Sequence, residues 1–394
     1  MDELCGEWEP DPLVSANTPS HDAEEDLRDE NSQFVSGWDF LGFRKEQRIK
    51  QAAKDAIRKY GVGTCGPAGF YGTLDVHLEL QDKLAQLLGT EAALVFAQGY
   101  AAISGVIPAF AKRGDVLVID EACGFAIQKG AELSRARIFW YKHCDPEDLE
   151  AKLQEAIMTR LSLRFIITEG LFTNTGNIAP LKKIVKLARQ YRFRLLLDDS
   201  AAIGALSPAG SCKYHNIPTN DPHLIICGTL SHTLGACGGF TAGSKIVIQH
   251  QVLSNQAYCF SASLPALFAV SAIKGIELMN DAKICELKAV VNAFERSYQE
   301  NASAFSIRGL IIEGQPGSPI RFLQATNPSI QNDREEFNIS HIRKQMLLHG
   351  YQIASRKVSP DEHCLWRPTL RICLGVGFPV ESFMNSLISS LPTP

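Results

Sequence analysis

Two neighbouring carboxylates are the first residues in this chain that could do chemistry. Asp198 and Asp199 directly follow the apolar run Phe193–Leu197, which has the composition of a buried strand. A carboxylate at the carboxyl end of such a strand could pair with a cationic ring nitrogen and keep that ring protonated. The same D-D-S sequence is also an ordinary strand exit. Position alone therefore leaves a binding role and a solvated turn equally open.

A glycine at a strand-to-helix turn marks a second candidate site. Gly99 and Tyr100 follow the short apolar run Ala93–Phe96 and open a helix that we expect over residues 101–112. Backbone N–H groups at a helix start suit a phosphate, and Tyr100 could cover one face of a ring. Because a glycine at such a turn is common without any ligand, the ordinary turn is the favoured interpretation of this feature alone.

The segment with the most glycines is Y-G-V-G-T-C-G-P-A-G-F-Y-G-T, residues 60–73. Glycine permits positive φ angles and a close approach of the backbone to a ligand or another chain. A flexible linker would not carry Cys65, Phe70 and Tyr71 among its glycines. The composition therefore predicts an ordered loop at a site or an interface.

A second glycine-rich segment, G-T-L-S-H-T-L-G-A-C-G-G-F at residues 228–240, contains His232. Ser231 could be a nucleophile activated by His232, but neighbours in sequence rarely face each other productively, and no G-x-S-x-G elbow frames them. The ten histidines lack ligand spacing, so we predict no metal site.

Composition excludes several classes of protein. The formal net charge is -4 and no stripe of Lys and Arg is present, so nucleic acid is not expected as a partner. Eleven cysteines, an odd number without C-x-x-C pairs, indicate reduced thiols in a cytosolic environment. No apolar run reaches the roughly 18–20 residues of a membrane span, and no signal peptide is evident.

Short apolar runs alternate with longer amphipathic ones through the middle of the chain, which predicts an α/β fold with a mostly parallel sheet covered by helices. Ligands in such sheets bind beyond the carboxyl ends of the strands. We divide the chain into an acidic arm and lead-in at 1–43, a large α/β domain at 44–270 and a smaller α+β domain at 271–394. After Pro265, a helix from Ala266 to Met279 is expected to continue through Ala289 to Tyr298. The predicted strands are Ala93–Phe96, Val116–Ile119, Ile138–Tyr141, Phe165–Thr168, Phe193–Leu197 and Leu224–Cys227.

Several motifs in order resemble the α-oxoamine synthases, pyridoxal 5'-phosphate (PLP) enzymes that condense an amino acid with an acyl-CoA and release carbon dioxide. The likeness spans nearly the whole chain. The motifs are E-W-E-P-D-P-L from Glu7, G-V-G-T-C-G-P-A-G-F-Y-G-T from Gly61, F-A-I-Q-K-G from Phe125, E-G-L-F-T-N-T-G-N-I-A-P-L from Glu169, Y-C-F-S-A-S-L-P from Tyr258 and L-R-I around Arg371.

The resemblance implies the aminotransferase-like fold (fold type I) and a cofactor site that has lost key groups. Catalytic relatives hold PLP as an imine to a lysine, and this chain has His232 at that position, which has no primary amine. Gly124 and Ala201 replace two histidines beside the ring. The resemblance retains Asp199 as the partner of the pyridine nitrogen and Arg371 as the carboxylate-binding arginine, with Gly99 and Tyr100 beside the cofactor.

Within the family the likeness is greatest to lysine-lacking subunits of the enzymes that condense L-serine with palmitoyl-CoA to 3-oxosphinganine. This implies a heterodimer whose lysine-bearing partner holds PLP covalently, at the cytosolic face of the endoplasmic reticulum membrane. Membrane association would be indirect, and the chain alone would be cytoplasmic and inactive. Ser261 and Ser263 would lie near the partner's PLP phosphate. The other interface residues implied are Cys65, Gly66, Phe70, Tyr71 and Gly72.

Two alternatives stay open at this stage. A self-contained PLP enzyme could use another lysine, of which Lys245 is the nearest downstream. The imine requires a precise reach from the ring, which makes this the weaker hypothesis. The chain could also be a regulatory scaffold without a role in catalysis.

Overall fold

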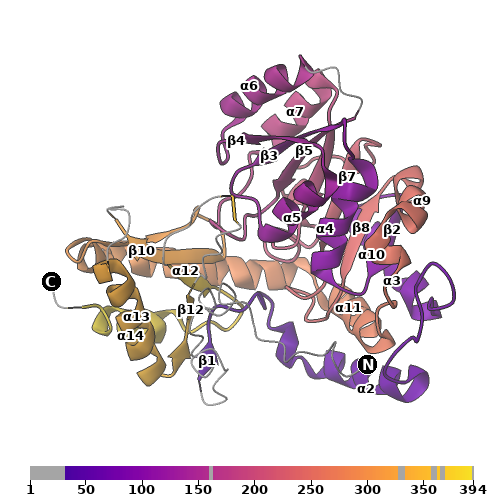
Figure 1. Ribbon diagram of the computed structural model, residues 1–394. Coiled ribbons are helices and arrows are strands. Elements are labelled where there is room, and N and C mark those ends of the chain that lie inside the picture. Colours follow the sequence, from indigo (N-terminus) through magenta and orange to yellow (C-terminus); the bar gives the residue numbers. More distant parts are fainter. Residues whose placement is uncertain (1–31, 159–162, 327–332, 356–361, 364–368, 393–394) are drawn as a thin grey trace, which may run out of the picture.

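The computed structural model describes residues 32–158, 163–326, 333–355, 362–363 and 369–392 (Figure 1). Most of the predicted acidic arm, with the E-W-E-P-D-P-L motif, lies outside the described residues. The described chain forms a large lobe built on a seven-stranded sheet and a smaller lobe built on a four-stranded sheet. The α/β fold with a mostly parallel sheet is confirmed.

The large sheet has the strand order β2-β8-β7-β6-β5-β3-β4. All six predicted strands are present, and the five from β7 to β4 are parallel to one another. The side chains of β3, β5 and β6 are almost entirely buried, as expected for strands covered on both faces. The bounds are β2 Ala92–Phe96, β3 Val116–Asp120, β4 Arg137–Tyr141, β5 Arg164–Glu169, β6 Arg194–Asp198, β7 Leu224–Thr229 and β8 Gly239–Gly243.

Strand β8 was not predicted, and it pairs antiparallel with both β2 and β7. Its sequence, G-F-T-A-G, contains no apolar run of the kind that indicates a buried strand. The glycine at its start has a packing reason: a Cβ on Gly239 would lie 2.8 Å from the Cα of Gly99. The close approach of β8 to the start of α4 therefore requires glycine on both sides.

Helices follow the strands in the expected alternation. The helix expected over residues 101–112 is present as α4, and it begins two residues earlier, at Gly99. Helix α6 begins where the side chain of Asp145 accepts hydrogen bonds from the N–H groups of Glu147 and Asp148. The helices of this lobe are α3 Asp75–Leu88, α4 Gly99–Phe110, α5 Phe125–Ser134, α6 Pro146–Ile157, α7 Leu181–Tyr191, α8 Gly210–Tyr214, α9 Lys245–Ser254 and α10 Gln256–Cys259.

The smaller lobe contains an antiparallel sheet of order β12-β13-β10-β9. Strand β1 of the lead-in, Gln33–Phe34, pairs with β11, Tyr351–Gln352, so the lead-in joins this lobe. The remaining elements are η2 Phe43–Lys45, α2 Gln47–Tyr60, α11 Ala266–Leu278, α12 Asp281–Ser306, β9 Leu310–Glu313, β10 Ile320–Ala325, α13 Asp333–Leu348, β12 Ala354–Ser355, β13 Leu370–Cys373 and α14 Val380–Ser389.

The expectation of one helix running from Ala266 through Tyr298 is wrong. The chain leaves the helical conformation at Met279, and α12 starts afresh at Asp281. The side chain of Asn280 accepts a hydrogen bond from the N–H of Lys283 and so caps the new helix. An asparagine between two apolar stretches was the signal for this break.

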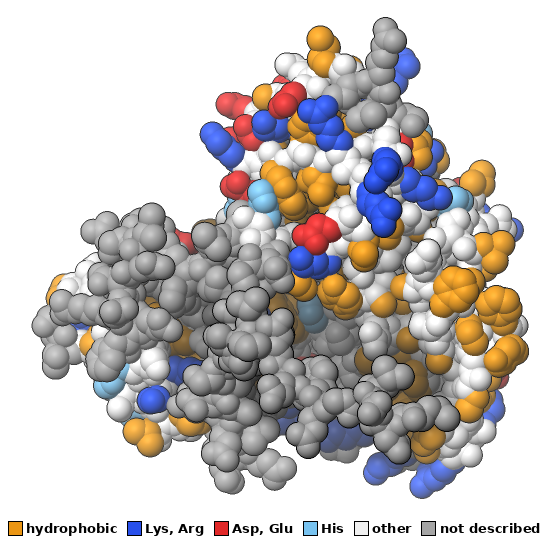
Figure 2. Space-filling model, viewed as in Figure 1, with side chains coloured by type: hydrophobic (Ala, Val, Ile, Leu, Met, Phe, Trp, Pro, Cys, Tyr) orange, Lys and Arg blue, Asp and Glu red, His pale blue; other side chains and the backbone are white. Residues whose placement is uncertain are grey.

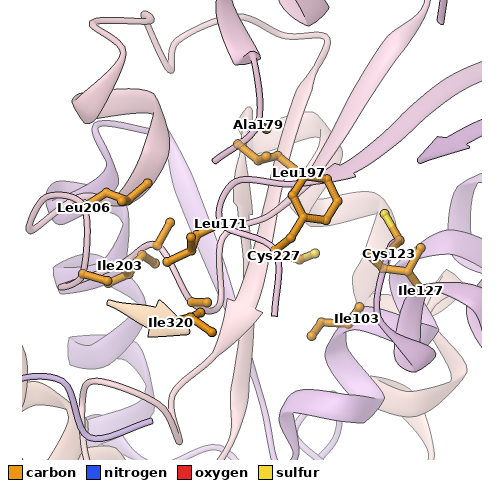
Figure 3. Close-up of a cluster of buried hydrophobic side chains, with 14 of the residues drawn as sticks. Ile103, Cys123, Ile127, Leu171, Ala179, Leu197, Ile203, Leu206, Cys227 and Ile320 are labelled. Atoms are coloured by element: carbon orange, nitrogen blue, oxygen red, sulfur yellow. The ribbon is translucent and has the colours of Figure 1, made fainter. Parts of the chain in front are cut away.

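One large buried cluster connects the lobes. It includes Ile103 of α4, Ile127 of α5, Leu197 of β6 and Ile320 of β10 (Figure 3). Because β10 belongs to the small sheet, the core is continuous across the boundary between the lobes. None of the helices in the described part of the chain is at once long and apolar enough to cross a membrane.

Candidate functional site

The candidate site lies at the carboxyl ends of three neighbouring parallel strands. Glu169 ends β5, Asp198 ends β6 in register with it, and the segment with His232 follows β7. A cavity of about 880 Å³ opens beside His232 and is also lined by Trp38 of the lead-in and Arg371 of β13. The site is thus built from both lobes, at the sheet edge where this fold class binds ligands.

His232 is held by its own chain. Its Nδ1 lies 3.2 Å from the carbonyl oxygen of Ser200. Its ring stacks on Trp38 with centroids 4.8 Å apart, and the guanidinium of Arg371 lies 4.3 Å from the Trp38 ring centroid. Desolvation has the largest effect on the pKa of His232 and lowers it to about 4. The side chain nevertheless keeps part of its surface exposed to solvent. The imidazole is therefore neutral at pH 7, and Nδ1–H donates to Ser200.

Arg371 keeps unused hydrogen-bonding capacity in this stack. One terminal nitrogen, Nη2, donates to the carbonyl oxygen of Ser36 at 3.3 Å. The Nε atom is buried and has no hydrogen-bond partner among the residues that the structure describes. A buried unsatisfied donor costs free energy, so this cavity favours an anionic group at Arg371.

The two carboxylates after β6 point to different partners, and this corrects the sequence-based choice between them. Asp199 accepts hydrogen bonds from the N–H and the hydroxyl of Ser211, at 2.9 and 2.5 Å, so its carboxylate faces α8. Asp198 accepts from the N–H and hydroxyl of Ser200, whose Oγ accepts from Thr229 N–H at 3.0 Å. Asp198, rather than Asp199, thus belongs to the network around His232. Successive residues of a strand point to opposite faces of the sheet, so moving the assignment by one residue, from Asp199 to Asp198, selects a carboxylate on the other face.

Glu169 lies against Gly124, one of the two positions where the resemblance implies a lost histidine. Its carboxylate accepts from the N–H of Gly124 at 2.5 Å and from the N–H and hydroxyl of Thr173 at 2.9 and 3.1 Å. Desolvation raises the pKa values of Glu169 and Asp198 above their usual ranges, and each lies near the other. Sequence reasoning missed Glu169, although it starts one of the quoted motifs.

Two hydroxyls lie beside the start of α4 and were not predicted as site residues. The Oγ atoms of Thr229 and Ser231 are 2.7 Å apart. A Cβ on Gly99 would lie 2.3 Å from Thr229 Oγ1, so glycine is required for this contact. Two hydroxyls at the N-terminus of a twelve-residue helix form a polar cradle of the kind that binds phosphate. Tyr100 follows and is half-exposed.

These residues fit only part of PLP. The cradle at α4 suits its phosphate, and Asp198 suits its ring nitrogen, but His232 offers no amine for the imine. Lys245 does not substitute for a lysine there. Strand β8 starts beside the carboxyl end of β7, at the sheet edge that His232 follows, and runs to the opposite edge, where Lys245 begins α9. A five-residue strand is roughly 17 Å long, so Lys245 begins at the far edge of the sheet. The hypothesis of a self-contained enzyme using Lys245 therefore has no geometric support.

The glycine-rich loop and the F-S-A-S segment lie side by side. Pro67 forms a β-bridge with Ala262, and the N–H of Ser263 donates to the carbonyl of Gly66 at 2.9 Å. The loop is tightly folded: a Cβ on Gly72 would lie 2.0 Å from the Gly66 oxygen, and Cys65 adopts a positive φ of 54°. We call residues 61–74 with 260–264 the interface platform.

The two serines of the platform differ in their exposure to solvent. Ser263 is buried, and its hydroxyl lies 2.5 Å from the Gly72 carbonyl, inside the platform. Ser261 is exposed, with its hydroxyl donating to the Ala257 carbonyl. Large apolar side chains stand out into solvent: Phe70, Tyr71 and Phe260 are 65%, 76% and 77% exposed. Exposed aromatic clusters of this kind are typical of protein interfaces.

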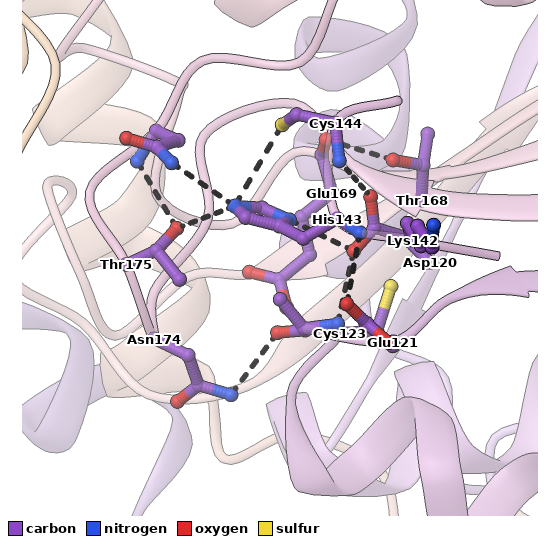
Figure 4. Close-up of polar contacts among 12 residues, drawn as sticks. Asp120, Glu121, Cys123, Lys142, His143, Cys144, Thr168, Glu169, Asn174 and Thr175 are labelled. Atoms are coloured by element: carbon purple, nitrogen blue, oxygen red, sulfur yellow. Dashed lines mark hydrogen bonds and ion pairs between the residues drawn. The ribbon is translucent and has the colours of Figure 1, made fainter. Parts of the chain in front are cut away.

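A Cys–His–Asp group lies where β3 and β4 end, next to Glu169 (Figure 4). His143 Nδ1 lies 2.9 Å from Asp120 Oδ1, and its Nε2 lies 3.0 Å from Thr175 Oγ1 and 3.7 Å from Cys144 Sγ. Burial raises the pKa of the Cys144 thiol well above its usual range, so the thiol is protonated. Hydrogen bonds account for both ring nitrogens, and we interpret the group as a structural network.

The comparison with protein families agrees with the architecture of the site. The model of the aminotransferase class I and II family matches residues 39–378. Serine palmitoyltransferase 1 of Dictyostelium discoideum is 32% identical over 98% of this chain and 85% of its own length. The chain belongs to the serine palmitoyltransferase 1 family. Long chain base biosynthesis protein 1 of Arabidopsis thaliana is 36% identical over 84% of this chain and 71% of its own length. The family expected from the motifs is thus confirmed.

Solved structures share the fold at lower sequence identity. A structure described as SPT with its PLP internal aldimine has a TM-score of 0.79 and 22% identity, covering 91% of this chain and 87% of that one. Serine palmitoyltransferase of Sphingomonas wittichii has a TM-score of 0.78 and 22% identity, covering 92% and 89%. The fold of PLP-dependent transferases is therefore confirmed for this chain.

Proposed function

We propose that this chain is the lysine-lacking subunit of a heteromeric serine palmitoyltransferase. With a lysine-bearing partner it would condense L-serine with palmitoyl-CoA to 3-oxosphinganine, in sphingolipid biosynthesis. The observation that carries the proposal is a contrast within one chain. The imine position holds His232, locked in a stack with Trp38, while the interface platform is fully built and presents exposed aromatic side chains.

PLP in the partner, covalently bound to its lysine, would supply the electron sink for the reaction at the serine α-carbon. The residues of this chain would act around that site. Phe70, Tyr71 and Phe260 would bury apolar surface against the partner and exclude water. The hydroxyl of Ser261, which is exposed, would be available to the partner's PLP phosphate. Ser263, with its hydroxyl bonded inside the platform, would hold the loop in shape.

The chain's own cavity has a different role in this proposal. The hydroxyls beside α4 and the guanidinium of Arg371 could each bind an anionic group without covalent attachment, but no primary amine is present at position 232. The chain alone would therefore form no imine with PLP. Relatives named serine palmitoyltransferase 1 support assigning the serine and palmitoyl-CoA chemistry to the complex.

Reconstitution tests the proposal directly. The full chain, a lysine-bearing serine palmitoyltransferase subunit from the same organism, and their mixture are each assayed for 3-oxosphinganine formation with L-serine, palmitoyl-CoA and PLP. We expect a stable complex, and turnover by the mixture with none by this chain alone. If the partner alone turned over as fast as the mixture, this chain would be a regulatory scaffold. A borohydride-trapped PLP adduct on a lysine of this chain would contradict the proposal.

The proposal places the complex at the cytosolic face of the endoplasmic reticulum membrane. With no membrane-spanning helix in the described residues, the partner would provide attachment. Membrane fractionation with and without the partner tests this. This chain should sediment with membranes only when the partner is present.

A further inference from the structure

His77 connects the two halves of the interface platform. It lies in the first turn of α3, just after the glycine-rich loop, and is only 3% exposed. Its Nδ1 lies 3.0 Å from the backbone nitrogen of Leu74, and its Nε2 lies 2.6 Å from the carbonyl oxygen of Leu264. One buried ring therefore contacts both the end of the loop and the end of the F-S-A-S segment.

The partners of His77 determine its tautomer. The backbone N–H of Leu74 can only donate, so Nδ1 must be the unprotonated nitrogen. Nε2 then carries the proton and donates it to Leu264. Desolvation lowers the pKa of His77, which favours this neutral form. The charged groups of the adjoining turn are Asp75, whose charge opposes that shift, and Lys59, which pairs with Asp75.

The other links between the two segments converge on Ser263. Its N–H and hydroxyl both reach the Gly66 carbonyl, at 2.9 and 3.2 Å, and its carbonyl accepts from the hydroxyl of Thr64 at 3.1 Å. Gly66 and Ser263 are both buried. His77 adds the one side-chain link that we find, among the described residues, from α3 to the backbone carbonyl of Leu264.

We infer that His77 is a positioning residue that holds the glycine-rich loop against segment 260–264, so that the platform is formed before the partner binds. A preformed surface loses less conformational entropy on association than one that must order. The link to Leu264 is the bond that matters for this role, because the bond to Leu74 stays within the turn that starts α3. The functional part of the inference rests on the proposed heterodimer.

Two substitutions separate the two bonds of His77. Asparagine ends near the position of Nδ1 and can still accept from Leu74, but it cannot reach Leu264. Glutamine ends near the position of Nε2 and can still donate to Leu264, but it loses the bond to Leu74. A role as a positioning residue predicts that His77→Gln resembles the wild type and His77→Asn does not. A role limited to capping α3 predicts the reverse order.

Hydrogen exchange on the isolated full chain tests the link without any partner. We expect His77→Asn to speed exchange in peptides covering 61–74 and 260–264 by about five- to tenfold, the effect of one lost hydrogen bond, with β6 and β7 unchanged. His77→Gln should differ from the wild type by less than about twofold. The matched control is His250→Asn, which removes a bond from another histidine to the Ala109 carbonyl outside the platform.

Titration of each variant into the lysine-bearing partner tests the consequence for function. His77→Asn should raise the concentration needed for half-maximal activity by about fivefold and leave kcat at saturation unchanged. Faster exchange in His77→Gln than in His77→Asn, or an equal effect of both, would overturn the inference. Absence of any activity with the wild-type chain would overturn the proposed function instead, while the exchange result would still stand.

Discussion

The His232 pocket and the interface platform use polar groups in opposite ways. In the pocket, side chains of this chain contact one another where a cofactor would be held: His232 stacks on Trp38, and Trp38 lies under Arg371. In the platform, the polar groups are paired inside and the apolar side chains face solvent. The side chains of the pocket thus pack on one another beside an open cavity, whereas the platform leaves three aromatic side chains exposed. In the proposed heterodimer, the partner would cover these aromatic side chains.

The strongest test of this contrast is to introduce charged side chains at the exposed aromatic positions of the platform. Tyr71→Asp combined with Phe260→Asp should weaken association with the lysine-bearing partner by about thirtyfold or more, because central aromatic residues dominate interface energies. The isolated chain should unfold at the same urea concentration as the wild type, since both side chains are exposed. Analytical ultracentrifugation gives the affinity. Leu348→Asp, at an exposed leucine of α13, is the control and should bind normally.

On the pocket side, the expected effect is on stability. Trp38→Ala removes a half-buried ring together with its contacts to His232 and Arg371, and should lower the free energy of unfolding by about 2 kcal/mol. Urea denaturation followed by circular dichroism measures it. Partner affinity should change less than in the platform variants. If Trp38→Ala left stability unchanged, the stack would be incidental rather than a link between the lobes.

A pair of serines offers a smaller test within the platform. Ser263→Ala leaves the buried carbonyl of Gly72 without its donor and should cost about 1–2 kcal/mol of unfolding free energy. Ser261→Ala removes a hydroxyl exposed to water and should cost less than about 0.5 kcal/mol. Equal costs would mean that the platform does not depend on its internal bonds.

The pH dependence of stability offers a further test beside the pocket. Burial raises the pKa of Asp199 to about 7 from its usual range near 4. Its folded form thus binds a proton more tightly than the unfolded chain, and the resulting stability is lost as pH rises from about 4 to about 7. In Asp199→Asn the amide oxygen can accept from the Ser211 N–H while the amide N–H donates to the Ser211 hydroxyl. The variant should reduce that slope by up to about 1 kcal/mol per pH unit.

Unfolding free energies between about pH 5 and about pH 8 measure this slope. The matched control is Asp221→Asn, which removes a carboxylate whose pKa is lowered and which pairs with Arg189 at the surface. That variant should leave the slope over this range unchanged. A steeper decline with pH in Asp199→Asn than in the wild type would refute the assignment of a raised pKa to this carboxyl.

Much of the fold was predictable because apolar runs mark buried strands. All six predicted strands, helix α4 and the family were found from residue patterns alone. Strand β8 was missed because its glycines are selected for close packing against α4 and carry no hydrophobic signal. The break between α11 and α12 was missed because one capping asparagine outweighed a long helical pattern.

For the site, the sequence by itself determined the chemistry that is missing: a histidine at position 232 cannot form an imine, whatever its surroundings. It also located the two segments of the platform, since their motifs are local. Only the tertiary structure decided which carboxylate belongs to the His232 network, because a shift of one residue along a strand reverses the face. It also revealed the Trp38 stack and the His77 link, which join residues 194 and 187 positions apart in the chain. Contacts over such distances depend on the packing of whole elements, and no local pattern encodes them.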